Sequence, residues 1–281
     1  MKKQKEIITA ADLQQYLLSI SPKLESSSAR IIIGNPETRI KKVGTAWTPY
    51  VNTLAKAVKQ GINVLVVYAP TFYMDEDPEE FEKLDFRYFN SMQSPARENY
   101  TTALLTKKKW IERNELVIIR CHHLLNLKNI PVGFAEILGC RDEDIVSSKD
   151  YYYVYKVEKD TALNISSKIA LNLKELNQPG VAFYGDPNRT VSTIGIGTGE
   201  MCDPRSYSEL NPDLCIGVDD TIWTWLQTSY AEDTGNPLIV INQGTSEEMG
   251  VRLLNEHLSK HIPSLEFLHM NQGCDYKWVI A

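Results

Sequence analysis

Short apolar runs recur along this chain and restrict its fold more than any other feature. Residues 64–67 read Val-Leu-Val-Val, which is apolar on both faces, as expected for a strand covered on both sides of a parallel sheet. Segments with helical spacing lie between the runs. This alternation predicts an α/β fold with mainly parallel strands, in one sheet or in two. Similar runs occur at residues 31–33, 116–119, 181–184, 214–216 and 238–241.

Helix signals flank these runs. Thr9 and Asp12 have capping-box spacing and predict a helix start. A second helix ends near Gly61, where a glycine C-cap is expected. Two more helices are predicted over residues 161–177 and 221–231. The apolar stripe of the helix before Gly61 is predicted to consist of Val51, Leu54, Ala55 and Val58.

Length and composition allow two α/β units. The chain has 281 residues, of which 43% are hydrophobic, and this is enough to bury a full core. We expect residues 1–125 to form an N-terminal lobe that residues 245–281 complete. Residues 126–244 are expected to form the second lobe.

Charge and cysteine usage exclude several classes of protein. The net charge is −6 and the basic run at residues 107–109 is short, so we interpret that run as a solvated helix face and expect no nucleic-acid partner. The acidic cluster at residues 75–80 is interpreted as a solvated loop or helix start. The five cysteines are widely spaced, which implies neither a disulfide framework nor a cysteine zinc site.

The chain lacks the sequence signals of a membrane or exported protein. No apolar stretch approaches the roughly 20 residues that span a bilayer, and the charged start has no signal-peptide core behind it. We therefore expect a cytoplasmic protein with no membrane partner.

Polar residues follow three of the predicted strands, at the strand ends where α/β folds carry their functional sites. We call these three segments strand exits. The first reads Tyr-Ala-Pro-Thr-Phe-Tyr over residues 68–73, the second Arg-Cys-His-His over residues 120–123, and the third Asn-Gln-Gly-Thr-Ser-Glu-Glu over residues 242–248. These exits contain the strongest candidates for a binding or catalytic site.

The three exits, in this order, resemble the Nif-three-like family of dinuclear metal-centre proteins, the homologues of GTP cyclohydrolase I type 2. The resemblance rests on residues 70–73, on Arg120 with His122, and on residues 244–248, and it extends to residues 44–47 and 272–274. It implies a two-lobed fold, two divalent metal ions per chain and a homohexameric ring. Among the family's patterns at the first exit, residues 68–73 most resemble that of the subtype with His-Glu-Pro-Thr-Phe-Tyr.

Most ligand positions of that family are substituted here. By resemblance, the metal positions are Tyr68, Ala69, His123, Gln243 and Glu247, and only Glu247 keeps the family residue. Two divalent ions about 3.5–4 Å apart need bridging anions, and a single retained carboxylate does not supply them. We expect at most one metal ion, held by His122 or His123 with Glu247 and Tyr68.

Each of these residues also has an explanation without metal. Glu247 and Glu248 are expected in the first turn of a helix, where carboxylates favour the dipole, and Thr245 has capping-box spacing to Glu248. Tyr68 can fill the volume of the absent centre.

Weaker signals suggest residues that line a pocket. Asp219 and Asp220 are natural N-caps for the following helix, but they also lie at a strand exit. Gly197 and Gly199 form either a tight turn or an anion-binding loop, and the turn is favoured. Thr71 is a further candidate for the lining.

Two classes of function remain. The first is a non-catalytic protein that keeps the fold for small-molecule binding or for assembly, with a second copy of the chain as partner. The alternative is a metal-assisted hydrolase with a modified, mononuclear centre and a metal-bound water as nucleophile. The sequence identifies no catalytic residue, and nothing in it selects GTP.

Overall fold

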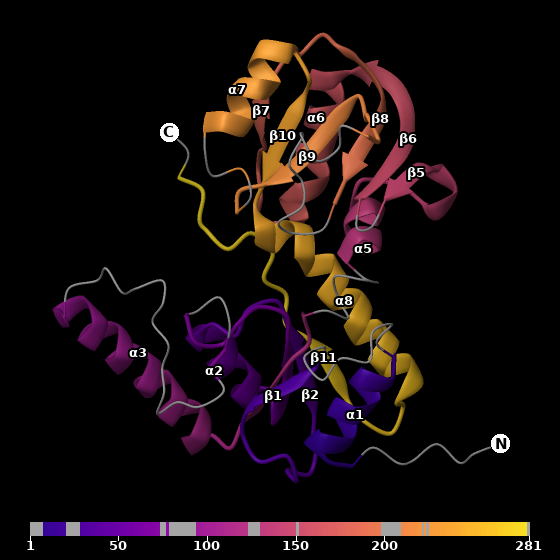
Figure 1. The fold of residues 1–281 in the computed structure, drawn as a ribbon. Coiled ribbons are helices and arrows are strands. Elements are labelled where there is room, and N and C mark those ends of the chain that lie inside the picture. Colours follow the sequence, from indigo (N-terminus) through magenta and orange to yellow (C-terminus); the bar gives the residue numbers. More distant parts are fainter. Residues whose placement is uncertain are drawn as a thin grey trace. The chain divides into compact units, whose positions relative to one another are not determined.

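The computed structural model describes residues 8–20, 29–73, 77–78, 94–122, 130–149, 152–197, 209–220, 222 and 225–279 (Figure 1). The chain divides into two compact units, residues 1–124 with 254–270 and residues 125–253 with 271–281. The sequence prediction assigns residues 245–281 as a whole to the first lobe. In the structure the division falls inside one helix, and the last segment belongs to the second unit.

The first unit contains a five-stranded sheet. Four of its strands run parallel, and the edge strand β1 pairs antiparallel with β4. Every residue of the three central strands is buried. For β3 and β4 this confirms the prediction of strands covered on both faces. The strand order is β1 (Arg30–Ile33), β4 (Val117–Arg120), β3 (Val64–Val67), β2 (Val43–Ala46) and β11 (Phe267–His269).

The helices of the first unit are α1 (Ala10–Ile20), α2 (Val51–Lys59), α3 (Ser94–Arg113) and the C-terminal part of α8 (Gln243–His261). The predicted capping box of α1 is confirmed. Asp12 Oδ2 accepts hydrogen bonds from Thr9 N and Thr9 Oγ1, both at 3.0 Å, and Thr9 Oγ1 accepts from Asp12 N at 3.2 Å.

The predicted apolar stripe of α2 is partly wrong. Val51 is 49% exposed, and the buried face consists of Thr53, Leu54 and Ala57. The buried face is shifted by one residue from the predicted stripe: Thr53 is buried in place of an apolar residue, and Ala55 is exposed. Gly61 adopts φ +77°, as expected for a residue that ends a helix.

The second unit contains a six-stranded mixed sheet. Its centre, β8-β9-β10, is parallel, and the other three pairs are antiparallel. The expectation of mainly parallel sheets therefore describes the first unit better than the second. The strand order is β5 (Ile145–Lys149), β6 (Tyr152–Thr161), β8 (Thr190–Ile196), β9 (Leu214–Val218), β10 (Leu238–Ile241) and β7 (Ala182–Tyr184).

Strand β7 differs from its prediction as a covered strand. It lies at the sheet edge, pairs only with β10 and leaves Ala182 exposed. An edge strand has one neighbour, so apolar composition alone does not place it in the interior.

The helices of the second unit are α5 (Ile130–Ile137), α6 (Ala162–Asn172), α7 (Trp225–Thr234) and the start of α8, with short 3₁₀ turns at Asp142–Asp144 and Leu173–Leu176. The prediction over residues 161–177 matches α6 and the 3₁₀ turn that follows it. The helix predicted over 221–231 is described from Trp225 onward, because residues 221, 223 and 224 lie outside the described part of the chain.

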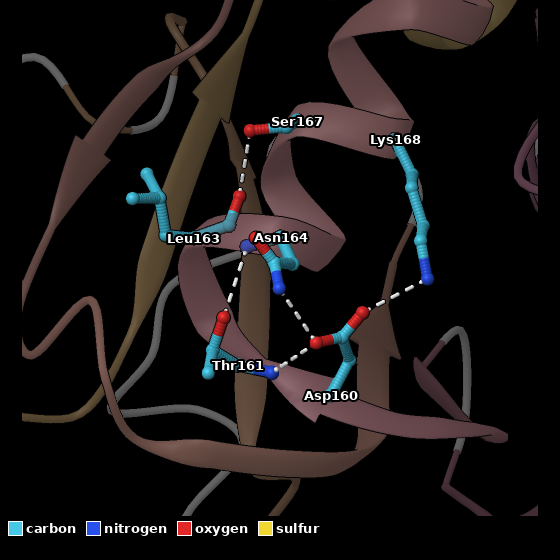
Figure 2. A network of polar contacts seen from close by, with 6 residues as sticks. All are labelled: Asp160, Thr161, Leu163, Asn164, Ser167 and Lys168. Atoms are coloured by element: carbon cyan, nitrogen blue, oxygen red, sulfur yellow. Dashed lines mark hydrogen bonds and ion pairs between the residues drawn. The ribbon is translucent and has the colours of Figure 1, made fainter.

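A polar network fixes the start of α6 (Figure 2). Thr161 Oγ1 accepts from Asn164 N at 3.3 Å, which caps the helix. Asp160 accepts from Thr161 N and Asn164 Nδ2, both at 2.8 Å, and pairs with Lys168 Nζ at 2.9 Å. These contacts turn the chain from β6 directly into the helix.

Each sheet is covered by apolar helix faces. In the first unit Leu54, Leu104 and Ile111 are buried with sheet residues such as Leu65 and Ile118. In the second unit Phe134, Ile165 and Ile169 of α5 and α6 are buried with Ile194, Ile216 and Ile239. Within the described residues, no helix has the length and apolar character needed to cross a bilayer.

Two glycines allow α5 and α8 to pack closely in the second unit. A Cβ atom on Gly250 would lie 2.5 Å from Ile130 Cγ1 and 2.7 Å from its Cα. A Cβ atom on Gly133 would lie 2.9 Å from Gly250 N. Since backbone atoms cannot move aside cheaply, the contact depends on glycine at both positions.

We predict that Gly250→Ala destabilises the protein. Alanine gains about 1 kcal/mol of helix propensity, but the clash with Ile130 costs about 1–3 kcal/mol, so we expect a net loss of up to about 2 kcal/mol in urea unfolding. Gly180→Ala is the control, because nothing lies within 4 Å of its added Cβ. Equal stability of the two variants would contradict the close contact.

Candidate functional site

The exits of β3 and β4 lie side by side, because these strands are parallel neighbours. Tyr68 is buried, and its ring packs on that of His122, with centroids 4.8 Å apart and planes at 31°. The backbone N–H groups of Tyr68 and Ala69 donate to Trp47 O at 3.1 and 2.9 Å. Ala69 offers no ligand atom in its side chain. His123 lies outside the described residues.

A buried ionic cluster holds the turn that follows β3. Asp77 Oδ1 accepts from Thr71 N at 2.6 Å and from Phe72 N at 3.2 Å, while Lys107 Nζ donates to Thr71 O at 2.5 Å. Asp77 is 3% exposed and Lys107 4% exposed. The prediction of solvated charge runs is therefore wrong at both residues, because each run supplies one charge that fixes this turn.

Burial changes the proton affinity of both charged groups. It raises the pKa of Asp77, against the opposing effect of the Thr71 amide and of Arg120. Burial lowers the pKa of Lys107 to about 8, and the charge of Asp77 acts in the opposite direction. Thr71 Oγ1 and Asp77 Oδ2 are buried without a hydrogen-bond partner. The role of Thr71 in lining a pocket stays a prediction.

We predict that Lys107 contributes a rise in stability with pH between about 8 and 10. The folded state loses the Lys107 proton near pH 8, whereas an unfolded lysine keeps its proton to about pH 10.4, so at this group the unfolded chain binds more protons in this window. Burial of Cys121 and Cys140 raises their pKa values and acts in the opposite direction, so the contribution is read as the difference between the unaltered chain and Lys107→Met. In urea unfolding series, Lys107→Met should lower the slope of stability against pH by up to about 1.4 kcal/mol per pH unit.

The matched control is Lys109→Met, since Lys109 lies on the same helix and is exposed. Lys109→Met should keep the slope of stability against pH that the unaltered chain has. An equally unchanged slope in Lys107→Met would contradict the assignment of this pH dependence to Lys107.

The exit of β10 centres on Asn242, which is 2% exposed. Its Nδ2 donates to Asp219 Oδ2 at 3.0 Å and to Asp275 Oδ1 at 2.6 Å. Its Oδ1 accepts from Thr245 N at 3.3 Å and Asp275 N at 3.1 Å. Its backbone N–H donates to Gln178 Oε1 at 3.1 Å. Asn242 thus joins segments that are far apart in the sequence.

Asp219 caps a different helix from the one predicted. Its Oδ1 accepts from Gln243 N at 2.9 Å, at the start of α8. The helix that follows Asp219 in sequence, α7, is described from Trp225 onward. The exits of the parallel neighbours β9 and β10 are adjacent, so the aspartate reaches the next exit instead. Asp220 is exposed.

The helix-start explanation of the two glutamates is also wrong. Helix α8 begins at Gln243, and no acidic residue lies in its first turn. Glu248 Oε1 accepts from Gln272 N at 2.9 Å instead of completing a capping box, and Thr245 Oγ1 is buried without a partner. The cap is supplied by Asn242, through its bond from Thr245 N.

Glu247 lies on the second turn of α8 and is completely buried. Gln243 Nε2 donates to Glu247 Oε1 at 3.4 Å, one helical turn away. The predicted metal positions Gln243 and Glu247 are therefore brought together, and the amide is a hydrogen-bond donor to the carboxylate.

The C-terminal segment adds two groups to this region. Burial raises the pKa of Asp275, as does the nearby charge of Asp219, while the bond from Asn242 lowers it. Burial raises the pKa of Tyr276 to about 12, with further contributions from Asp219 and Asp275. No sequence pattern predicts a role for Asp275, which follows the resembling segment 272–274. No pattern predicts a role for Gln178 either.

The glycine-rich turn after β8 is described only in part. Gly197 is buried directly after the strand, and Gly199 lies outside the described residues. In the part of the chain that the structure describes, no group of three or more His, Cys, Asp or Glu residues is placed to hold a metal ion.

Comparison with solved structures identifies the fold. A hypothetical protein of Staphylococcus aureus matches with a TM-score of 0.73 and 15% identity, covering 98% of this chain and 100% of that one. A Bacillus cereus protein related to NIF3 matches with a TM-score of 0.70 and 11% identity, covering 99% and 100%. HcgD from Methanocaldococcus jannaschii, in its reduced form, matches at 0.65 and 17%, covering 95% and 100%.

No family model and no curated protein matches the sequence. The structural matches cover nearly whole chains on both sides, so both units share the architecture of these proteins. The chain therefore has the NIF3-like α/β fold, as the strand exits predict.

We predict that Asn242→Ala lowers the free energy of unfolding by about 3 kcal/mol. It removes a helix cap worth about 1 kcal/mol and leaves buried groups unpaired at about 1–3 kcal/mol each. Asn172→Ala is the control, because that exposed side chain makes a single bond, to Ile137 O at 2.9 Å. A loss no greater than the control's in urea unfolding would contradict the role of Asn242.

Proposed function

We propose that this chain is a non-catalytic Nif-three-like protein that keeps the fold to bind a small molecule or to assemble with further copies of itself. The observation that carries the proposal is the Gln243 Nε2 to Glu247 Oε1 hydrogen bond of 3.4 Å. A histidine at position 243, as in the family, would offer an imidazole lone pair to an ion, whereas the glutamine amide donates a hydrogen bond to the carboxylate. Here one carboxylate oxygen already accepts from an amide that has replaced the family's histidine.

The donor set at the resembling positions does not fit a dinuclear centre. Glu247 supplies one negative charge, Ala69 supplies no ligand atom, and the ring of Tyr68 is packed against His122. Two divalent ions about 3.5–4 Å apart need more bridging anions than this. We therefore propose no metal-dependent chemical step for this protein.

Two observations support a role in binding or assembly. The fold matches solved proteins over 98–100% of the two chains, although sequence identity is only 15%. Helix α7 also presents apolar surface, with Trp225 74% exposed and Leu226 51% exposed. Association with another chain would bury these exposed apolar side chains. Homo-oligomerisation, with the hexamer implied by resemblance, belongs to this proposal, and native mass spectrometry tests it.

The metal content of the purified chain tests the non-catalytic function. We expect Glu247→Gln to leave it unchanged, because any metal held elsewhere contributes equally to both proteins. In the triple variant Tyr68→His, His123→Asp and Gln243→His, which restores the family ligands, we expect tightly held metal that a further Glu247→Gln removes.

One result would overturn the proposal. If the unaltered chain holds about one metal ion that Glu247→Gln removes, together with a hydrolytic activity, the alternative of a mononuclear metal-dependent hydrolase is correct.

A further inference from the structure

Two histidines and a tyrosine meet at the end of α8 in the first unit, and none of them belongs to the candidate site. His257 and His261 are one helical turn apart, and their rings stack with centroids 4.1 Å apart and planes at 24°. Tyr16 of α1 approaches the same pair, with its hydroxyl 3.3 Å from His257 Nε2. His261 is exposed.

The contacts fix which nitrogen of each ring can act as a ligand. His261 Nδ1 lies 2.8 Å from His257 O, and because a carbonyl only accepts, Nδ1 carries the proton and Nε2 carries the lone pair. Burial raises the pKa of Tyr16, so its phenol stays protonated and can donate to His257 Nε2. Both histidines then present Nε2 as the basic nitrogen.

The spacing of the two histidines suits one shared ion. Residues four apart on a helix lie on the same face, and two histidines at this spacing are a known zinc-binding arrangement. The rings are stacked with centroids 4.1 Å apart, so they must rotate about their side-chain bonds before both Nε2 lone pairs converge on the ion. His261 is also the last residue of α8, where the helix dipole favours a cation.

We propose that His257 and His261 form a binding site for a divalent transition-metal ion such as Zn²⁺ or Cu²⁺, with Tyr16 beside it. Imidazole nitrogen suits both ions, and Cu²⁺ binds more tightly than Zn²⁺ in the general order of affinities. Water molecules complete the coordination. The metal takes the Nε2 lone pair of His257 and displaces the hydrogen bond from the Tyr16 hydroxyl.

Calorimetric titration of the chelator-treated full chain with Zn²⁺, in a non-coordinating buffer near neutral pH, tests this site. We expect His261→Gln, an exposed substitution that should not perturb folding, to weaken binding roughly tenfold or more, because one of two ligands is lost. His257→Gln should do the same. Binding should also weaken below about pH 6, where protons compete for imidazole.

Two control variants separate this site from others. His269→Gln changes a histidine of the same unit whose Nδ1 lies 3.0 Å from Thr45 Oγ1, and it should leave Zn²⁺ affinity unchanged. Glu247→Gln should also leave it unchanged, so the result does not depend on the proposed function. Undiminished affinity in His261→Gln, or no Zn²⁺ binding by the unaltered chain, would overturn the proposal.

Discussion

The side chain of Asn242 is the contact on which the candidate site of the second unit depends. Its two atoms make four hydrogen bonds, to Asp219, to Thr245 and, twice, to Asp275. An asparagine can do this because it offers donors and an acceptor at once. One buried amide thereby holds a strand exit, a helix start and the C-terminal segment at fixed positions.

The groups around the family's metal positions are paired with one another. Gln243 donates to Glu247, and Tyr68 packs on His122. A buried carboxylate is costly unless hydrogen bonds or opposite charges compensate it. If Gln243 stands where the family has a metal-binding histidine, as we propose, the glutamine removes a ligand and at the same time supplies a donor to Glu247. This coupling is the physical basis for our proposal that the protein is non-catalytic.

Much of the fold follows from local sequence patterns. The central strands of the first sheet and the Thr9–Asp12 cap depend on neighbouring residues, so periodicity and spacing predict them. The burial of Asp77 and Lys107 was not predicted, because a run of charged residues does not indicate which of its side chains points into the interior. Asp219 was misassigned because it caps a helix that lies beside it in space and 24 residues away in sequence.

Other features of the site could not be predicted at all. Asp275 reaches Asn242 across 33 residues, and no local pattern encodes such a contact. His123 and Gly199 lie outside the described residues, and their roles stay predictions.

Anomalous diffraction from crystals soaked in Zn²⁺ tests the central claim most directly. We predict no anomalous peak within about 2.2 Å of the Glu247 carboxylate, the distance at which zinc binds oxygen, and a Gln243 amide in hydrogen-bond contact with it. An ion at that distance from Glu247, with the Gln243 side chain turned away or coordinating through its oxygen, would contradict it.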